Sequence, residues 1–437
     1  MNSTNLKVTA FVVLVLFAAS NSLVENAIVK ATDSSTTPTS TNIGSIAWSQ
    51  TYNAGNVMEI DSVVGIQDGG YLLGGTSRAG SRIVLLGVDS EGDLLWNKTY
   101  DGVGNHLSNW LIPTADGNYA IAGQYQGGFW LAEVDSNGNL LWNQTIMGTG
   151  FSWPTSLTQT TEGGFALVGQ TGSSLGQTHS SSLDAMGVIW LVRTDSSGNL
   201  QWNSTLGQGG AWSVVQNSAG GFAVACTLGN SLPDWLLLTT DSTGNLLLSK
   251  TYGSQDDDVC YSVVQTNDGG YALGGWMWLR SNGGGPNQAI VKTDASGNIE
   301  WTKYFGSGLT RYMASTSDSG FVLVGTKLTK VDASGIEQWE VALQTNSSGT
   351  EGYSATETSG GAFLVGGYGG NMNGWLAKIT SDAVAPTQKP TASVQEPSVS
   401  PIPTVPEFPA LAILLISLFI PIILVFRPQK KNSRRMI

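Results

Sequence analysis

Aromatic side chains are the residues in this sequence whose positions best suit ligand binding. They stand at the starts of predicted strands and in the loops that precede them, and two stand in one long predicted loop. Flat apolar rings with polar edges suit sugar rings or extended peptides. The candidate ligand-binding residues are Trp110, Trp153, Trp212, Tyr261, Trp276, Trp278, Tyr312 and Tyr353. The alternative is that several of these rings wedge between neighbouring repeats near a central channel.

Metal ligands and catalytic groups are sparse. His106 and His179 are the only histidines, and their neighbours are Asn, Ser, Thr and Gln rather than carboxylates, so no zinc site is predicted. The acidic run 256–258 carries hard oxygen ligands of the kind that suit Ca²⁺, but it lacks the spacing of a calcium loop, so a solvated turn is favoured. The sequence contains no nucleophile elbow, His-Glu-x-x-His motif or phosphate-cradling loop. It therefore predicts no catalytic residue, no metal and no cofactor.

Self-similarity along the chain gives the architecture that must position these residues. A Gly-Gly-aromatic turn recurs, in places in degenerate form, at intervals of 41 to 57 residues. The seven copies begin at Gly69, Gly117, Gly163, Gly220, Gly269, Ser319 and Gly360. This period suits a four-stranded propeller blade. An all-β fold, a seven-bladed β-propeller, is therefore predicted over residues 43–382.

The first repeat contains the four predicted strands of a blade, at 62–67, 71–76, 83–89 and 94–100. The hairpin between the third and fourth strands has Asp three residues before Gly, and usually Trp four residues after it. Its copies are Asp89/Gly92/Trp96, Asp135/Gly138/Trp142, Asp195/Gly198/Trp202, Asp241/Gly244/Leu248, Asp294/Gly297/Trp301 and Asp332/Gly335/Trp339. We expect Asp to cap the turn, Gly to take the left-handed conformation and Trp to fill the space between outer strands.

The two ends of the repeat region complement each other. The seventh repeat stops after residues 375–379 without its tryptophan strand, whereas Gly44 and Trp48 carry the same four-residue spacing with no repeat before them. The N-terminal strand is therefore expected to complete the last blade. Such closure removes an exposed sheet edge.

The Asp…Gly…Trp hairpins and Gly-Gly-Tyr strands resemble the propeller repeats of the quinoprotein-like (PQQ-like) superfamily and of related secreted microbial propellers, over residues 44–382. The resemblance implies a propeller fold. The hairpin is one residue shorter than the usual quinoprotein hairpin, and we find no vicinal cysteine pair or quinone-stacking site, so cofactor binding is not carried over. The hairpins are also similar to sialidase Asp-boxes with unequal spacing, and in either family such turns are structural.

Loop lengths differ between the two faces of the predicted ring. The long insertions 171–187 and 276–288 both connect second to third strands, on the same face as the fourth-to-first connections. The opposite face has short, uniform turns. Because loops on a rigid scaffold usually carry function, the variable face is the predicted binding face.

Both chain ends carry targeting features. Residues 1–25 place one lysine before a short apolar run that ends in small residues, which predicts a cleaved signal helix or, alternatively, a retained anchor. Residues 26–42 are predicted to be a flexible segment. Residues 383–408 form a predicted Pro/Ser/Thr-rich stalk, 409–427 a transmembrane helix and 428–437 a basic cytoplasmic tail.

The stretch 405–409, Val-Pro-Glu-Phe-Pro, together with the apolar run and basic tail after it, resembles the PEF-type C-terminal sorting signals of archaeal surface proteins. This resemblance covers about the last 30 residues. It implies that a sortase-like enzyme processes the tail, as the alternative to a membrane helix with a cytoplasmic C-terminus. In both cases the propeller is expected to be extracellular, at the cell membrane.

Export would also permit covalent modification. Cys226 and Cys260 are the only cysteines, and either a disulfide joins them or both are buried thiols. Asn-x-Ser/Thr sequons make the chain a candidate glycoprotein. Their acceptor residues are Asn97, Asn143, Asn203 and Asn346.

Charge limits the partners. The formal net charge is −12, and the basic tail contributes cations that lie outside the propeller, so the repeat region is more acidic still. A field of that sign repels phosphate backbones, so no nucleic-acid partner is predicted. The predicted function is a cell-surface binding or adhesion propeller for polysaccharide or surface proteins. The alternatives are a surface-anchored carbohydrate-active enzyme and a purely structural envelope protein.

Overall fold

The computed structural model describes most of the repeat region. The described residues are 29–30, 44–53, 57–67, 69–77, 82–103, 110–173, 187–229, 233–280, 284–343, 349–369 and 373–381. The predicted signal peptide, stalk, transmembrane segment and basic tail lie outside these residues. In the described part, no helix is long and apolar enough to cross a membrane.

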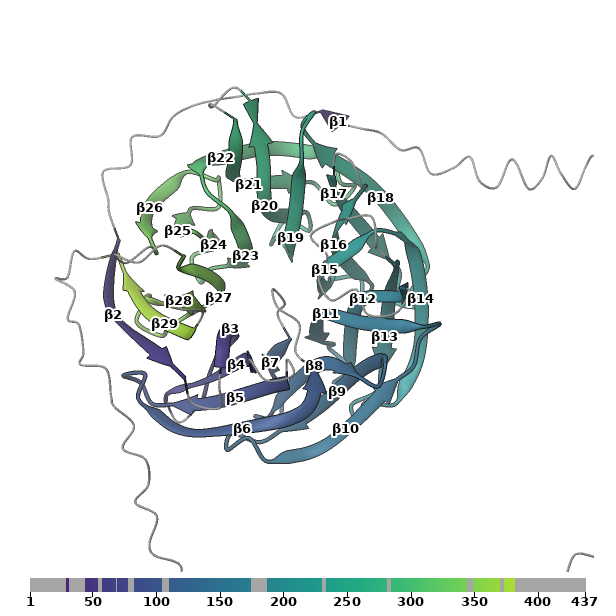
Figure 1. Ribbon diagram of the computed structural model, residues 1–437. Helices are drawn as coiled ribbons and strands as arrows, with labels where there is room; N and C mark the ends of the chain where they lie inside the picture. Colours follow the sequence, from purple (N-terminus) through teal and green to yellow (C-terminus); the bar gives the residue numbers. More distant parts are fainter. Residues whose placement is uncertain are drawn as a thin grey trace, which may run out of the picture. The chain divides into compact units, whose positions relative to one another are not determined.

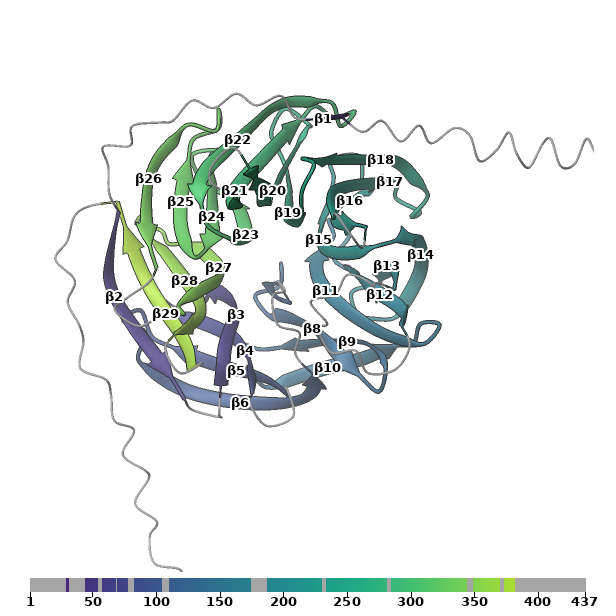
Figure 2. The same cartoon turned by 45° about the horizontal axis from the view of Figure 1, so that its top comes forward.

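Seven antiparallel blades are arranged around a common centre, with β3, β11, β15, β19, β23 and β27 innermost (Figures 1 and 2). Blades 1 and 2 are joined into one sheet by the pairing of Val103 with Gln124. Blades 1 and 2 comprise β3 (Val57–Gly65), β4 (Tyr71–Ser77), β5 (Arg82–Val88), β6 (Leu94–Val103), β7 (Leu111–Pro113), β8 (Tyr119–Tyr125), β9 (Gly128–Val134) and β10 (Leu140–Ile146). Blades 3 and 4 comprise β11 (Phe151–Gln159), β12 (Phe165–Ser173), β13 (Val188–Thr194), β14 (Leu200–Gln208), β15 (Gly210–Gln216), β16 (Phe222–Leu228), β17 (Asp234–Thr240) and β18 (Leu246–Gly253).

The remaining strands complete the ring. Blades 5 and 6 comprise β19 (Asp258–Gln265), β20 (Tyr271–Leu279), β21 (Gly285–Thr293), β22 (Ile299–Ser307), β23 (Thr310–Ser315), β24 (Phe321–Gly325), β25 (Lys327–Val331) and β26 (Glu337–Ala342). Blade 7 comprises β27 (Glu351–Glu357), β28 (Phe363–Gly369), β29 (Asn373–Thr380) and the N-terminal β2 (Ser45–Tyr52). The predicted all-β, seven-bladed propeller is confirmed.

Chain closure occurs as predicted. β2 pairs antiparallel with β29, with Thr51 opposite Trp375. The short strand β1 (Val29–Lys30), within the segment predicted to be flexible, runs parallel to β18 at the outer edge of blade 4. The last blade therefore has its outer strand from the N-terminal side of the repeats, and both ends of the ring are held in one sheet.

The hydrophobic pattern explains which strands lie inside. The middle strands are nearly continuous apolar runs: β9 is buried along its whole length, and β13 is buried except at its first residue. The outer strands alternate, as in β10, where exposed residues flank the half-buried Trp142. Middle strands are covered on both faces by neighbouring blades, whereas outer strands face solvent. The core is thus a series of layers between blades rather than a single central cluster.

The predicted chemistry of the outer hairpins is confirmed. In blade 2 the Asp135 carboxylate accepts hydrogen bonds from the backbone N–H of Asn137 at 2.9 Å and of Asn139 at 2.8 Å, and Gly138 has φ +69°. The other five Asp residues cap their turns in the same way. The local sequence therefore fixes each hairpin independently of its blade.

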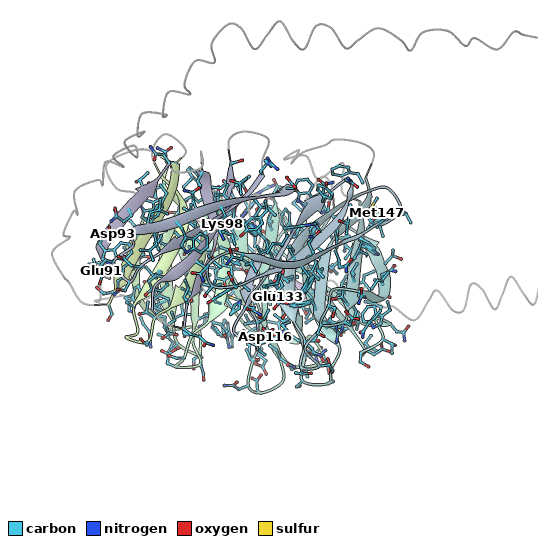
Figure 3. All side chains as sticks on the ribbon, turned by 90° about the horizontal axis from the view of Figure 1, so that it is seen from below. Glu91, Asp93, Lys98, Asp116, Glu133 and Met147 are labelled. Carbon is cyan, nitrogen blue, oxygen red and sulfur yellow. The ribbon has the colours of Figure 1, made fainter. Side chains whose placement is uncertain are left out.

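The two families of connections lie on opposite faces. Asp116, in a first-to-second turn, lies toward one face, and Met147, at the start of a fourth-to-first connection, lies toward the other (Figure 3). One predicted loop was wrong in part: residues 276–279 and 285–288 extend the β20–β21 hairpin, with Trp278 opposite Pro286. Alternating ladder hydrogen bonds continue past the blade there, so much of that insertion is strand rather than loop.

Candidate functional site

A β-bulge recurs at the same place in the inner strands. In β15 the partner of Ala211 is Cys226 and that of Ser213 is Ala225, so Trp212 is an extra residue. Equivalent register shifts leave one extra residue in five other inner strands. These residues are Asp61, Thr155, Tyr261, Arg311 and Tyr353. A bulge bends the strand and redirects the side chain that it carries.

Four of the six bulge residues line a cavity of about 260 Å³ at the centre of the ring. They are Trp212, Tyr261, Arg311 and Tyr353, and the inner strands of blades 2 to 6 supply the rest of the lining. Each lies in the first half of its strand, on the side of the fourth-to-first connections. The repeated bulge therefore lets similar inner strands present four dissimilar side chains to one space.

Arg311 is the best-connected side chain of this site. Its Nε donates to the Glu351 carboxylate at 2.7 Å, and its Nη1 donates to the hydroxyl oxygen of Tyr261 at 2.7 Å. The guanidinium also lies 5.5 Å from the centre of the Tyr261 ring. Tyr368 donates a further hydrogen bond to Glu351 at 3.3 Å. These contacts join side chains of blades 5, 6 and 7 into one network. Within it, Tyr261 and Arg311 are 50 positions apart in the sequence.

Charge at the site is stable across neutral pH. Burial lowers the pKa of Arg311, but Tyr261 and Glu351 outweigh burial, so the pKa lies above its usual range and the guanidinium stays charged. Burial, followed by the Glu351 carboxylate, raises the pKa of Tyr353 well above 10, so that phenol stays neutral. The site therefore presents the Arg311 cation beside the neutral phenol of Tyr353.

The aromatic rings are packed around this cation. Trp212 and Tyr261 have ring centres 5.1 Å apart, and Tyr353 and Tyr368 have ring centres 5.6 Å apart. Trp212 donates from Nε1 to Thr227 at 3.1 Å, which fixes the plane of its ring. Rings with fixed planes and accessible faces can stack on a planar or cyclic ligand at a low entropic cost.

Half of the predicted aromatic residues meet in the cavity. Trp212, Tyr261, Tyr312 and Tyr353 line it, on strands β15, β19, β23 and β27. Trp153 does not line it and instead stacks on Phe151, with ring centres 6.0 Å apart. The cavity is thus made by the later blades, where the bulge carries a large side chain.

Trp110 is a wedge and not a ligand-binding surface. It is only 2% exposed, and its ring lies 2.8 Å from where a Cβ of Gly74 would stand. It therefore fills the gap between blades 1 and 2. The alternative interpretation of these aromatic residues, as wedges between repeats, is correct for Trp110.

Trp276 and Trp278 also lie away from the cavity. Both are in β20, where the Trp276 carbonyl accepts a hydrogen bond from Trp235 at 3.2 Å and Trp278 is 37% exposed. Neither lines the cavity. Trp276 pairs with Val259 and Gln288 within the sheet of blade 5, whereas Trp278 lies in the extension of the hairpin, opposite Pro286.

The acidic run 256–258 is not a simple solvated turn. Asp258 is buried and accepts hydrogen bonds from Ser254 and from Trp278 N–H at 2.9 Å. Asp256 pairs with Arg280 at 2.5 Å. No group of three or more metal-ligating side chains occurs in the described stretches, and His106 and His179 lie outside them. The run therefore ties the connection between blades 4 and 5 to the end of β20.

The remaining predicted modification sites are distributed as follows. Cys226 and Cys260 are buried, free thiols in blades 4 and 5. Asn97, Asn143 and Asn203 are exposed on outer strands, although the Oδ1 atoms of Asn143 and Asn203 accept hydrogen bonds from Trp130 and Trp190. Asn346 lies outside the described residues. Glycosylation and the disulfide stay predictions.

Arg311 and Glu351 were missed in the sequence. The clue that could have found them was a serine that follows the bulge residue in five inner strands and accepts a hydrogen bond from an N–H of the adjacent blade. Examples are Ser156 with Val214 at 3.3 Å and Ser262 with Met313 at 2.9 Å. The repeat of Arg311 has Tyr312 in place of this serine, but Arg311 stands eight residues before Ser319 of its turn, as Trp212 stands before Gly220 and Tyr261 before Gly269.

The fold and this site define a seven-bladed β-propeller with a lined central cavity. No family model and no curated protein matches the chain. Among solved structures, the Pan2 WD40 domain of Neurospora crassa has a TM-score of 0.53 at 9% identity, covering 83% of this chain and 100% of that chain. Hydrazine synthase of Kuenenia stuttgartiensis has a TM-score of 0.53 at 13% identity, covering 76% and 97%.

A third structure, BBS1N in complex with ARL6DN, has a TM-score of 0.51 at 9% identity and covers 79% of this chain and 99% of that chain. At these identities the likeness shows the propeller fold alone. The likeness to quinoprotein-like repeats stays a prediction.

Proposed function

We propose that this protein is a binding propeller that takes one sugar unit of a polysaccharide into its central cavity. The observation that carries the proposal is the set of Trp212, Tyr261, Tyr312 and Tyr353, which four different blades bring to one space. Aromatic faces with polar edges favour sugar rings, whose apolar faces stack and whose hydroxyls hydrogen-bond. Ligand pockets usually measure about 300–1,000 Å³, so a cavity of about 260 Å³ suits one ring-sized group.

Binding is favoured over glycoside hydrolysis at this site. Hydrolysis commonly needs two carboxyl groups on either side of the scissile bond. Among the described residues that line the cavity, none is Asp or Glu. The buried Glu351 is occupied by Arg311 and Tyr368, and Asp61 accepts a hydrogen bond from Thr76 at 3.0 Å.

We further propose that the propeller is displayed outside the cell, on the stalk of residues 383–408. An apolar run after one lysine at the N-terminus, and the run 409–427 followed by cations, support this location. A surface position suits a module that recognises polysaccharide. The sortase-like processing of the tail is the alternative to a membrane helix.

Binding can be tested with a polysaccharide array probed with the purified full chain in detergent. Trp212→Ala should reduce binding at least about tenfold, because it removes a stacking face. Trp278→Ala is the matched control: it removes an indole of the same size from the extended hairpin and should leave binding unchanged. Thermal unfolding of both variants checks that they are folded.

If the folded wild-type chain binds no polysaccharide, the proposal is wrong. Loss of binding in Trp278→Ala, with Trp212→Ala unchanged, would instead place the site on the β20–β21 hairpin. A protein partner is then the next candidate, since one structure with this fold, BBS1N, was solved in complex with ARL6DN.

A further inference from the structure

We propose that the sugar unit held in the central cavity carries a carboxylate, and that Arg311 binds it. This inference rests on the proposed function and specifies its ligand as an acidic polysaccharide that contains uronic acid units. It depends on the charge of the cavity and on the atoms of Arg311 that the protein leaves available.

Arg311 is the charged side chain of the cavity. Among the described residues that line the cavity, the others are uncharged, while its ion-pair partner Glu351 is not part of the lining. The cavity thus faces the cation, and the carboxylate that balances it lies outside the lining. An anionic group in the cavity would complete the coordination of the guanidinium.

One edge of the guanidinium is available. Nε is engaged by Glu351 and Nη1 by Tyr261, whereas Nη2 donates to no residue in the part of the chain that the structure describes. Nη1 also has a second N–H beyond the one given to Tyr261. Two parallel N–H groups on the neighbouring nitrogens Nη1 and Nη2 match the two oxygens of a carboxylate.

Glu351 and Tyr261 are positioning residues in this proposal. They hold Nε and Nη1 of the guanidinium, so the orientation of Nη2 is fixed before the ligand arrives. Side chains that are fixed in advance lose less entropy on binding. Lysine at this position would keep the charge, but it would lack the planar fork that engages both partners and a ligand together.

The net negative charge of the whole chain separates binding at this site from nonspecific ionic attraction. A protein with a net charge of −12 repels polyanions at long range, so weak nonspecific attraction does not explain binding of an acidic polysaccharide. Added salt screens this repulsion, whereas a partly buried pair is screened less. Affinity should therefore hold or rise as salt increases from low to physiological concentration, opposite to nonspecific ionic binding.

The test compares oligogalacturonate with the same oligosaccharide after reduction of its carboxyl groups, by calorimetry on the full chain in detergent. The wild-type chain should bind the acidic form at least about tenfold more tightly than the reduced form. Arg311→Lys should lose most of this preference. Trp212→Ala should weaken binding of both forms, because it removes the stacking face and not the anion contact.

The double variant Arg311→Gln/Glu351→Gln guards against misfolding, because it removes the cation and its buried partner together. If it is folded by thermal unfolding and binds both forms equally, the inference is supported. Equal binding of both forms by the wild type, or full preference retained by Arg311→Lys, overturns the inference and leaves the proposed function standing. If the wild type binds neither these forms nor any neutral polysaccharide, the proposed function itself fails.

Discussion

The indole of Trp96, in the outer strand of blade 1, lies directly against Gly138, in the outer hairpin of blade 2. A Cβ at Gly138 would stand 2.8 Å from the ring, and Tyr100, further along the same strand as Trp96, donates to the Gly138 carbonyl at 2.6 Å. The same contact joins Trp48 to Gly92, Trp142 to Gly198, Trp202 to Gly244 and Trp301 to Gly335. The hairpin glycine thus adopts the left-handed conformation that its own turn needs, and its lack of a side chain leaves room for the tryptophan of the neighbouring blade.

Gly138→Ala should destabilise the protein more than a turn glycine without this contact. Gly163 is the matched control, since it has φ +85° and a Cβ at this position would meet no atom within 4 Å. Alanine in the left-handed region costs about 1–2 kcal/mol at either site. At Gly138 the clash with Trp96 should add about 1–3 kcal/mol. Chemical denaturation of both variants gives the difference, and equal losses would show that the ring moves aside freely.

Leu248→Trp should be tolerated. Leu248 occupies the tryptophan position of blade 4, because its Cδ2 lies 2.9 Å from where a Cβ of Gly297 would stand, and Tyr252 donates to the Gly297 carbonyl at 2.8 Å. We expect the free energy of unfolding to change by less than about 1.5 kcal/mol. The reverse change, Trp202→Leu, should cost about 1–3 kcal/mol. A severe loss of folding in Leu248→Trp would show that this site differs from the others.

Removal of residues 43–52 should lower both the unfolding temperature and the solubility. The deletion takes away β2, and β29 then becomes an exposed edge with unpaired backbone groups. A truncation that ends before residue 43 is the control, because it leaves the β2–β29 pairing in place. Differential scanning calorimetry and light scattering measure the two effects, and unchanged behaviour of the longer deletion would contradict the role of closure.

Asp258 should make stability depend on pH between about 4 and 6. Burial raises its pKa from 3.8 to about 6, and the nearby Asp234 carboxylate contributes. In this window the folded state binds more protons than the unfolded state, so stability is lost as pH rises. Because one unit of pKa shift corresponds to about 1.4 kcal/mol, the unfolding free energy should fall by about 3 kcal/mol across this window. The difference in unfolding free energy between wild type and Asp258→Asn, measured across this range, isolates the effect; a constant difference would contradict it.

Much of the fold was predictable because its determinants are local. The Asp caps and left-handed glycines of the hairpins depend on residues within four positions of one another, so one repeat is enough to recognise them. The spacing of Gly44 and Trp48 also predicted closure, and Gly44 indeed lies against Trp339 of blade 6. The extent of the β20–β21 hairpin was not predicted, since ladder pairing past the blade depends on both strands at once.

The sequence by itself determined the number of blades, the outer hairpins and the manner of closure, because the repeats and their turns depend on residues close together in the chain. Only the tertiary structure decided which aromatic residues face the channel, since a bulge of one residue changes the face on which a strand residue lies. It alone also brought Arg311 to Glu351 and Tyr261, 40 and 50 positions away. Those contacts exist because the ring places successive inner strands side by side, and no local pattern encodes them.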